Sequence, residues 1–226
     1  MTDKPTDEGT KNRLRILYWR PLFKMEAERL LDLLGTQELE LSRWEAGLED
    51  RLESELPLAQ DPDHENLIIN YHHEFQAFYP QKARASSFLT LWAWYEHRLH
   101  SACGILQRYK GVGVGSHDLK GYGPTPAMEY LKLVGGFDPV ASRPVEAERW
   151  GRIKRYYTLR NVLVHSAGFA DAKKAAQLKS LRGVRSTSSV IAVENELLYV
   201  AFDDFCAALD QVADHLVKLL PSKQTT

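Results

Sequence analysis

The chain has 226 residues, of which 44% are hydrophobic and 26% charged, a composition typical of a globular protein rather than a disordered or fibrous one. Its 29 Lys and Arg residues nearly balance 30 Asp and Glu residues. The net charge of -1 therefore excludes a chain-wide attraction for nucleic acid or an anionic membrane. The 2 cysteines are too few for a disulfide framework, and no apolar signal or membrane-spanning segment is apparent, so we expect a cytoplasmic protein with no membrane partner.

The N-terminal quarter of the chain predicts a tail and then helices. Residues 1–12 carry charge, Thr, Pro and Gly without an apolar anchor after the first residue, which favours a flexible tail. Over residues 25–56 apolar side chains recur every three or four residues, as on one face of a helix. Because Gly35 interrupts this pattern and Pro57 ends it, we expect two helices or one broken helix, in an N-terminal helical extension that covers residues 13–57.

Two further helices are expected before the middle of the chain. Asp61 and Pro62 are typical of a helix start, and the helix that follows is expected to end or kink at Pro80. Apolar residues then repeat at helical spacing over residues 86–110, which predicts a long core helix. The glycine-rich residues 111–123 favour an exposed loop, because they lack the Gly-Lys-Ser/Thr ending of a phosphate-binding loop.

The second half of the chain predicts shorter elements and a long closing helix. These elements are a short helix at 125–134, a helix from Pro144 to about Ala167 that stops at Gly168, a weak helix at 171–182, a small β-hairpin near residues 189–200 with strands at 190–193 and 197–200, and a helix at 202–220. The chain is therefore expected to be all-α, a helical bundle with one small β-hairpin, whose main domain covers residues 58–221.

One segment places a charge within an apolar surface. When residues 152–168 are drawn as a helix, five apolar positions fall within about 60° of Arg160. They are Ile153, Tyr156, Leu163, Val164 and Ala167. Burial of an unpaired guanidinium costs several kcal/mol, so we expect a carboxylate or a phosphate beside Arg160. Glu96 is the expected partner, since apolar positions flank it on the 86–110 helix.

A second stripe of the same helix gathers basic, aromatic and imidazole side chains. It contains Trp150, Lys154, Tyr157, Asn161 and His165, between roughly 60° and 140° from Arg160 around the helix. Histidine exchanges protons near neutral pH, and arginine offers a fixed fork for phosphate oxygens. This edge therefore predicts chemistry on a phosphate.

Arg160, Asn161 and His165 match the short signature of the HEPN superfamily, in which an Arg and a polar residue precede a His after a short gap. The sequence resembles this family over about residues 62–220, although only the signature is specific within that span. Members with an intact signature are typically metal-independent endoribonucleases that dimerise and bring both signatures into one cleft.

The resemblance implies a role for each residue of the site. His165 would act on the ribose 2′-hydroxyl or on the leaving oxygen, and Arg160 would stabilise the charge on the phosphate, while Asn161 orients the imidazole or holds the phosphate. Trp150, Lys154 and Tyr157 would extend the RNA-binding surface, and Glu96 would support Arg160. The resemblance also implies a toxin-like or antiviral role, a homodimer with a composite active site, an antitoxin or sensor protein as partner, and neither a metal nor another cofactor.

Three alternatives remain open at the level of sequence. Arg160 can be a structural arginine paired with Glu96, with His165 a polar residue near a helix end. A HEPN-like domain can also be a catalytically inactive binding or dimerisation module. The histidines between residues 64 and 100 instead allow a metal-binding helical-bundle protein. They are His64, His72, His73, His97 and His100, and they match no familiar zinc motif.

Overall fold

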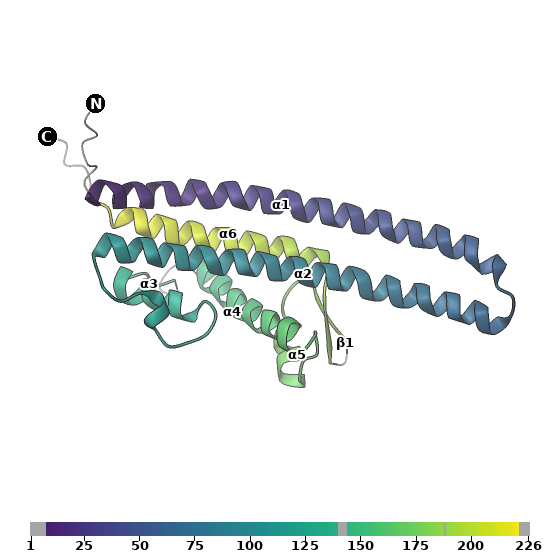
Figure 1. Cartoon of the computed structure of the whole chain (residues 1–226). Coiled ribbons are helices and arrows are strands. Elements are labelled where there is room, and N and C mark those ends of the chain that lie inside the picture. The colour runs from purple at the N-terminus through teal and green to yellow at the C-terminus, as the bar shows by residue number, and fades with distance from the viewer. Residues whose placement is uncertain (1–7, 140–143, 188, 222–226) are drawn as a thin grey trace, which may run out of the picture. The chain divides into compact units, whose positions relative to one another are not determined.

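The computed structural model of the chain describes residues 8–139, 144–187 and 189–221, apart from the side chains of Glu74, Phe75 and Ala77. Its elements are α1 (Glu8–Glu55), the 3-10 turn η1 (Leu56–Leu58), α2 (Pro62–Lys110), the 3-10 turn η2 (Ser116–Asp118), α3 (Thr125–Gly135), α4 (Pro144–His165), α5 (Ala172–Leu178), β1 (Val184–Thr187), β2 (Val190–Val193) and α6 (Asn195–Lys218) (Figure 1). The predicted all-α fold with a small β-hairpin is confirmed. None of the helices in the described part of the chain combines the length and hydropathy of a membrane-spanning segment.

Contacts divide the chain into two compact units. The first unit contains Met1–Glu28, Leu91–Leu159 and Ala201–Thr226, and the second contains Arg29–Thr90 and Arg160–Val200. The helices α1, α2, α4 and α6 each contribute residues to both units. The predicted ranges 13–57 and 58–221 follow a different division, which stays a prediction.

The core of the first unit is aromatic. The ring of Phe205 on α6 stacks on Tyr95 of α2, with ring centroids 4.5 Å apart, and meets Tyr156 of α4 edge-on at 5.5 Å. All three side chains are fully buried. The N-terminal part of α1 joins this unit through buried Trp19 and through Arg20, which pairs with Asp210 of α6 at 2.9 Å.

The second unit contains an antiparallel pair of helices, formed by the last part of α1 and the first part of α2, which turn at η1 (Figure 1). Arg84 of α2 makes two-pronged hydrogen bonds to the Glu38 carboxylate of α1, at 2.9–3.2 Å. Both side chains of this ion pair are largely shielded from solvent. The pKa of Arg84 is raised, and the hydrogen bond to Glu38 is the largest cause. The helix α2 starts as predicted, with the Asp61 side chain accepting a hydrogen bond from the backbone of His64 at 2.8 Å.

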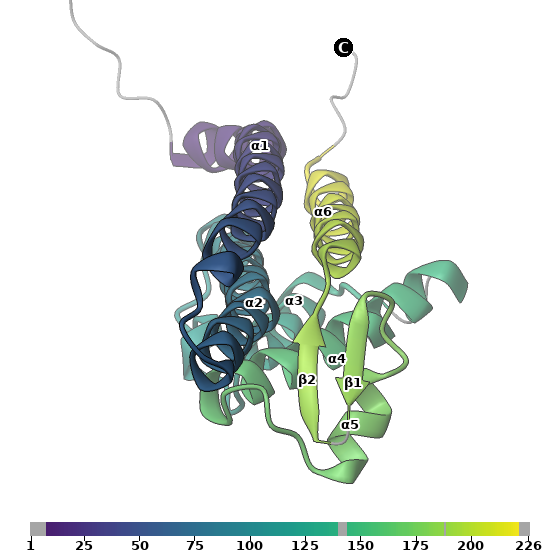
Figure 2. The same ribbon diagram turned by 90° about the vertical axis from the view of Figure 1, so that its right-hand side faces the viewer.

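The small sheet also belongs to the second unit. The strands β1 and β2 pair antiparallel, with Val184 opposite Val193 (Figure 2). Ile191 and Val193 are buried, and the Gln81 side chain of α2 donates to the backbone oxygen of Ile191 at 3.2 Å. The hairpin is therefore anchored by one hydrophobic face and by a side-chain hydrogen bond.

The predicted break at Gly35 and the predicted helix end at Pro80 are wrong. The helix α1 passes through Gly35, and α2 passes through Pro80, so that one helix replaces the two expected in each place. The alternative of a kink at Pro80 stays a prediction. A glycine inside a helix costs only about 1 kcal/mol relative to alanine, and a proline about 3 kcal/mol. Long packed helices offset both costs, since Pro80 itself is buried.

Two smaller predictions also need correction. Residues 8–12 of the predicted tail are helical, whereas residues 1–7 lie outside the described residues. Asn12 anchors this first part of α1, since it is buried and donates a hydrogen bond to the backbone oxygen of Arg108 at 3.1 Å. The partner strand of β2 is β1, and residues 197–200 are helical instead. The absence of a turn-forming glycine in Glu194-Asn195-Glu196 agrees with that outcome, since Asn195 starts α6.

Candidate functional sites

The first candidate site lies at the end of α4, in the second unit. Arg160 Nη1 donates to Asn161 Oδ1 at 3.0 Å and lies 3.4 Å from His165 Nε2. Because a guanidinium only donates hydrogen bonds, this second contact is a hydrogen bond in the tautomer of His165 whose Nε2 carries no proton. The three predicted catalytic residues therefore form one hydrogen-bonded group, called here the α4-end cluster.

Solvent reaches this cluster because the helix ends beside it. Ala167 and Gly168 adopt left-handed backbone conformations, with φ of 50° and 92°, and the Gly168 N–H donates to the Val162 oxygen at 3.1 Å. Arg160 and Asn161 are half-buried, whereas His165 is exposed. The cluster thus presents an accessible imidazole next to a guanidinium that is held by two neighbours, an arrangement that can bind an anion and exchange a proton.

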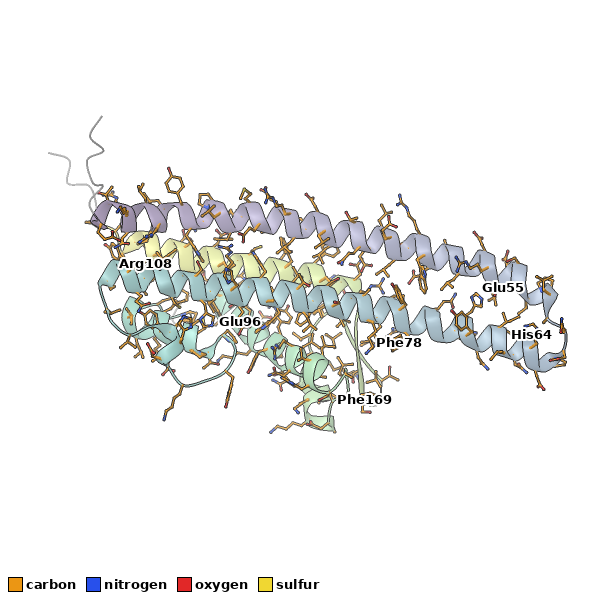
Figure 3. The ribbon with its side chains drawn as sticks, viewed as in Figure 1. Glu55, His64, Phe78, Glu96, Arg108 and Phe169 are labelled. Atoms are coloured by element: carbon orange, nitrogen blue, oxygen red, sulfur yellow. The ribbon has the colours of Figure 1, made fainter. Side chains whose placement is uncertain are left out.

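The supporting residue Glu96 lies on the part of α2 that belongs to the first unit (Figure 3). Its carboxylate accepts a hydrogen bond from Trp92 Nε1 at 3.2 Å. Among the described residues of the second unit, no ion pair includes Arg160, whose hydrogen-bond partners are Asn161 and His165. The predicted pairing of Arg160 with Glu96 would join the two units, and it stays a prediction.

The second candidate site is a pocket of the first unit with a volume of 360 Å³, called here the aromatic pocket. Trp150, Lys154 and Tyr157, the three residues predicted to contact RNA, all line it. Lys154 is exposed, Tyr157 is half-buried and Trp150 is buried. The sequence thus identified three residues of one pocket, although the buried indole offers a ligand only part of its surface.

Neighbouring side chains hold the aromatic walls of this pocket in place. Trp150 Nε1 donates to Gln211 Oε1 at 2.8 Å, and the Tyr157 ring stacks on Trp92 with centroids 5.8 Å apart. Gly123, with φ of 62°, lies so close to the Tyr157 ring that even one added methyl group would overlap it. The pocket is therefore shaped before any ligand arrives, which lowers the entropic cost of binding.

A third ring in the wall carries a hydroxyl without a partner. Tyr95 lines the pocket, is fully buried, and its hydroxyl makes no hydrogen bond within the described residues. Burial, with the charge of Glu96 as a smaller cause, raises the pKa of Tyr95 far above its usual value, so the hydroxyl stays a neutral donor. A buried donor without an acceptor costs free energy, and a ligand acceptor that reached it would recover that cost.

A smaller pocket of 230 Å³ lies in the second unit, between α2, the end of α4 and β2. Lys82, Leu163, Ala167 and Ile191 are among its lining residues, whereas the three residues of the α4-end cluster are not. The expectation that the cluster lines a cleft therefore gains no support from this pocket and stays a prediction.

Sequence reasoning missed the most buried ionic group of the first unit. Asp204 of α6 is 5% exposed and accepts two hydrogen bonds from Arg152, at 2.6 and 2.7 Å, and one from the Tyr156 hydroxyl at 2.9 Å. Its carboxylate also lies 3.5 Å from Arg149. The signal was available, because Asp204 falls on the apolar face of the closing helix beside Ala201, Phe205 and Ala208.

The histidines do not gather into a metal site. Within the described ranges no three His, Cys, Asp or Glu side chains are placed to hold a metal ion. His72 is buried and pairs with Glu55 at 3.2 Å, while His100 bonds to Ser116 at 3.1 Å. His64 lies near the start of α2, after the turn between α1 and α2 (Figure 3). The metal-binding alternative thus has no supporting geometry in this part of the chain.

Comparisons of the chain with protein-family models, with curated proteins and with solved structures returned no match. The geometry of the α4-end cluster and of the aromatic pocket is therefore the basis on which a function is proposed.

Proposed function

We propose that the chain is a metal-independent endoribonuclease of HEPN type. The observation that carries the proposal is the α4-end cluster, in which one guanidinium contacts both the Asn161 amide and the exposed His165 imidazole. An imidazole and a fixed guanidinium are the groups that RNA cleavage without a metal requires, since one moves a proton and the other stabilises phosphate charge.

The proposed reaction is an internal transesterification. The ribose 2′-oxygen attacks phosphorus, a 2′-O–P bond forms, and the bond from phosphorus to the 5′-oxygen breaks. His165 accepts the 2′-hydroxyl proton or supplies the proton that the leaving oxygen needs, while Arg160 binds the phosphate oxygens. The products are a 2′,3′-cyclic phosphate and a free 5′-hydroxyl, so neither metal-bound water nor another cofactor is consumed.

The further elements of the proposal concern partners and biology. Trp150, Lys154 and Tyr157 are proposed to contact RNA, because the aromatic pocket brings all three together. The chain is proposed to act as a homodimer in the cytoplasm, with a toxin-like or antiviral role and control by an antitoxin or a sensor protein. The homodimer, the cytoplasmic location, the biological role and the regulator rest on the resemblance of the signature residues alone.

The decisive experiment measures RNA cleavage by the purified chain in excess EDTA and identifies the product ends. We expect activity to survive chelation, and His165→Ala to lower the rate by about 10²–10⁴-fold, the usual contribution of a general acid or base. Since His165 is exposed, the melting temperature should stay unchanged. His97→Ala, which removes another exposed imidazole, is the matched control and should remain active.

Two results would count against the proposal. A folded His165→Ala protein with full activity would end the catalytic role of the cluster. Activity that EDTA abolishes and zinc or manganese restores would favour the histidines between residues 64 and 100 instead.

A further inference from the structure

The aromatic pocket has the features of a ligand site rather than of a packing defect. Its volume of 360 Å³ falls in the range of small-molecule sites. Three aromatic side chains, Tyr95, Trp150 and Tyr157, line it together with Met128 and Ile153. Hydrogen bonding to Gln211 fixes Trp150, and Trp92 and Gly123 restrain Tyr157. The half-buried Tyr157 ring, with the part of the Trp150 indole that the pocket reaches, therefore offers a flat apolar surface for a planar ring.

The rim of the same pocket is charged. Lys132 from α3 and Lys154 from α4 both line it, both are exposed, and neither forms an ion pair with any residue that the structure describes. The exposed Glu129 also lines the pocket. A fitting ligand therefore carries an anionic group for the lysines and an N–H donor for the Glu129 carboxylate, in addition to its planar ring.

We propose that the aromatic pocket binds one nucleoside phosphate unit, with its base against Tyr157 and Trp150 and its phosphate on Lys132 and Lys154. A nucleobase supplies the planar ring and the N–H donor, and the phosphate supplies the charge. The unit comes either from a free nucleotide or from a single RNA strand. The pocket's own residues carry the ligand chemistry, whereas its place in an RNA strand rests on the proposed nuclease function.

The test divides the ligand into its parts. Isothermal titration calorimetry of the full chain compares adenosine 5′-monophosphate with adenosine, which lacks the phosphate, and with ribose 5-phosphate, which lacks the base. We expect the complete nucleotide to bind at least about tenfold more tightly than either part, the factor that one charge-assisted contact or one stacked base typically provides. Equal affinities for adenosine and the nucleotide would overturn the assignment of the lysines.

Matched variants locate the binding site. The double variant Lys132→Gln and Lys154→Gln changes only exposed side chains, so it should fold normally and weaken nucleotide binding by about tenfold or more. Lys120→Gln, an exposed lysine of the same unit outside the pocket lining, should bind as the unchanged chain does. Tyr157→Leu removes a stacking surface, and Tyr122→Leu is its exposed control. Unchanged affinity in both pocket variants would overturn the proposal.

A last experiment tests whether the bound nucleotide belongs to an RNA strand or is a free nucleotide, in a variant whose nuclease activity is removed. A short single-stranded oligoadenylate is titrated into His165→Ala, which we propose cannot cleave it. Binding that is tighter than that of the mononucleotide and lost in the double lysine variant supports an RNA strand as the ligand, and binding of the mononucleotide alone supports a free nucleotide. A chain that cleaves RNA but binds no nucleotide in this pocket refutes the inference and leaves the proposed function intact. A chain that binds the nucleotide in this pocket but never cleaves RNA supports the inference and refutes the proposed function.

Discussion

Asp204 shows how strongly one buried carboxylate can organise the side chains around it. It accepts two short hydrogen bonds from Arg152 and a third from the Tyr156 hydroxyl, within the first unit. The hydrogen bond to Asp204 is the largest cause that raises the pKa of Arg152, so this guanidinium is charged at every relevant pH. The group therefore joins α4 to α6 by charge-assisted hydrogen bonds.

Asp204→Ala should lower the free energy of unfolding by about 3 kcal/mol, the low end for breaking a buried ion pair, because Arg152 and Tyr156 lose their shared buried acceptor while Arg152 keeps its ion pair with Glu148 at 3.1 Å. The low end applies since the Arg152 side chain keeps 25% exposure. Urea denaturation measures the difference. Asp203→Ala removes the adjacent exposed carboxylate and should change stability by less than about 0.5 kcal/mol. An equal decrease in the free energy of unfolding in the two variants would show that the buried hydrogen bonds of Asp204 do not stabilise the chain more than an exposed carboxylate does.

Sequence reasoning located the α4-end cluster but not the Asp204 group, for a reason of distance along the chain. Arg160, Asn161 and His165 fall within two turns of one helix, so spacing alone predicts that they are neighbours. Asp204 and Arg152 are 52 residues apart, and their pairing depends on how two helices pack. A single sequence shows that Asp204 lies on an apolar face of its helix, but it does not show which basic side chain forms an ion pair with it.

At the scale of elements, helix continuity was the feature that local signals misjudged. Gly35 is exposed, and a side chain added there would meet nothing within 4 Å. Gly35 therefore destabilises the helix only through the greater conformational entropy of glycine in the unfolded chain. This free-energy cost is too small to interrupt a helix that is packed over many turns. The periodicity therefore predicted the helical face correctly, whereas the predicted break near Gly35 was wrong.

Replacement of glycine by alanine should have opposite effects on stability at two positions of the chain. Gly35→Ala should raise the free energy of unfolding by about 0.5–1 kcal/mol, since alanine is the better residue inside a helix. Gly136→Ala should lower it by about 1 kcal/mol, because Gly136 caps α3 with φ of 71°, a conformation that strains alanine although the space is open. Chemical denaturation of both variants tests the pair, and a stabilised Gly136→Ala chain would contradict the account of the cap.

The glycine-rich loop is held to α2 by a titratable residue. His100 Nδ1 lies 3.1 Å from Ser116 Oγ, and the His100 ring stacks on His117 at 5.6 Å. Burial is the largest cause that lowers the pKa of His100, with Glu96 opposing and His117 and His97 adding to the effect. The folded chain therefore prefers the neutral imidazole at this position.

This preference predicts an acid-sensitive contribution to stability. The unfolded chain takes up the His100 proton near pH 6.5, whereas the folded chain does so only at lower pH. The stability that His100 provides is complete above about pH 6.5 and is lost as the pH falls through its folded-state pKa. We expect the melting temperature to drop less between about pH 7.5 and about pH 5 in His100→Gln than in the unchanged chain, with His73→Gln as a control, because His73 is exposed and does not contribute to the pKa shift of His100. An identical drop in all three proteins would exclude His100 as a contributor.

At the scale of the whole molecule, the sequence predicted the fold class and the positions of most helices better than it predicted which segments contact one another. An all-α chain with one hairpin follows from helical spacing and from one β-branched run near Ile191. The partner of that run was misplaced, because Arg185 and Ser186 leave Val184–Thr187 without an apolar pattern, whereas the wrongly predicted segment 197–200 is Leu-Leu-Tyr-Val. The two compact units depend on contacts between segments far apart in the chain, which no local pattern encodes.

The proposed homodimer is testable through the concentration dependence of cleavage. One α4-end cluster supplies a single imidazole, yet transesterification needs a proton removed from the 2′-oxygen and one delivered to the 5′-oxygen. A second copy of the chain would supply the second imidazole, so the cleavage rate per chain should fall when dilution separates the dimer, as sedimentation velocity follows in parallel. Excess His165→Ala should also inhibit the unchanged chain by forming mixed dimers, whereas an equal concentration of an unrelated protein should not. A rate per chain that stays constant across the dissociation range, without inhibition by the variant, would assign the whole reaction to one chain.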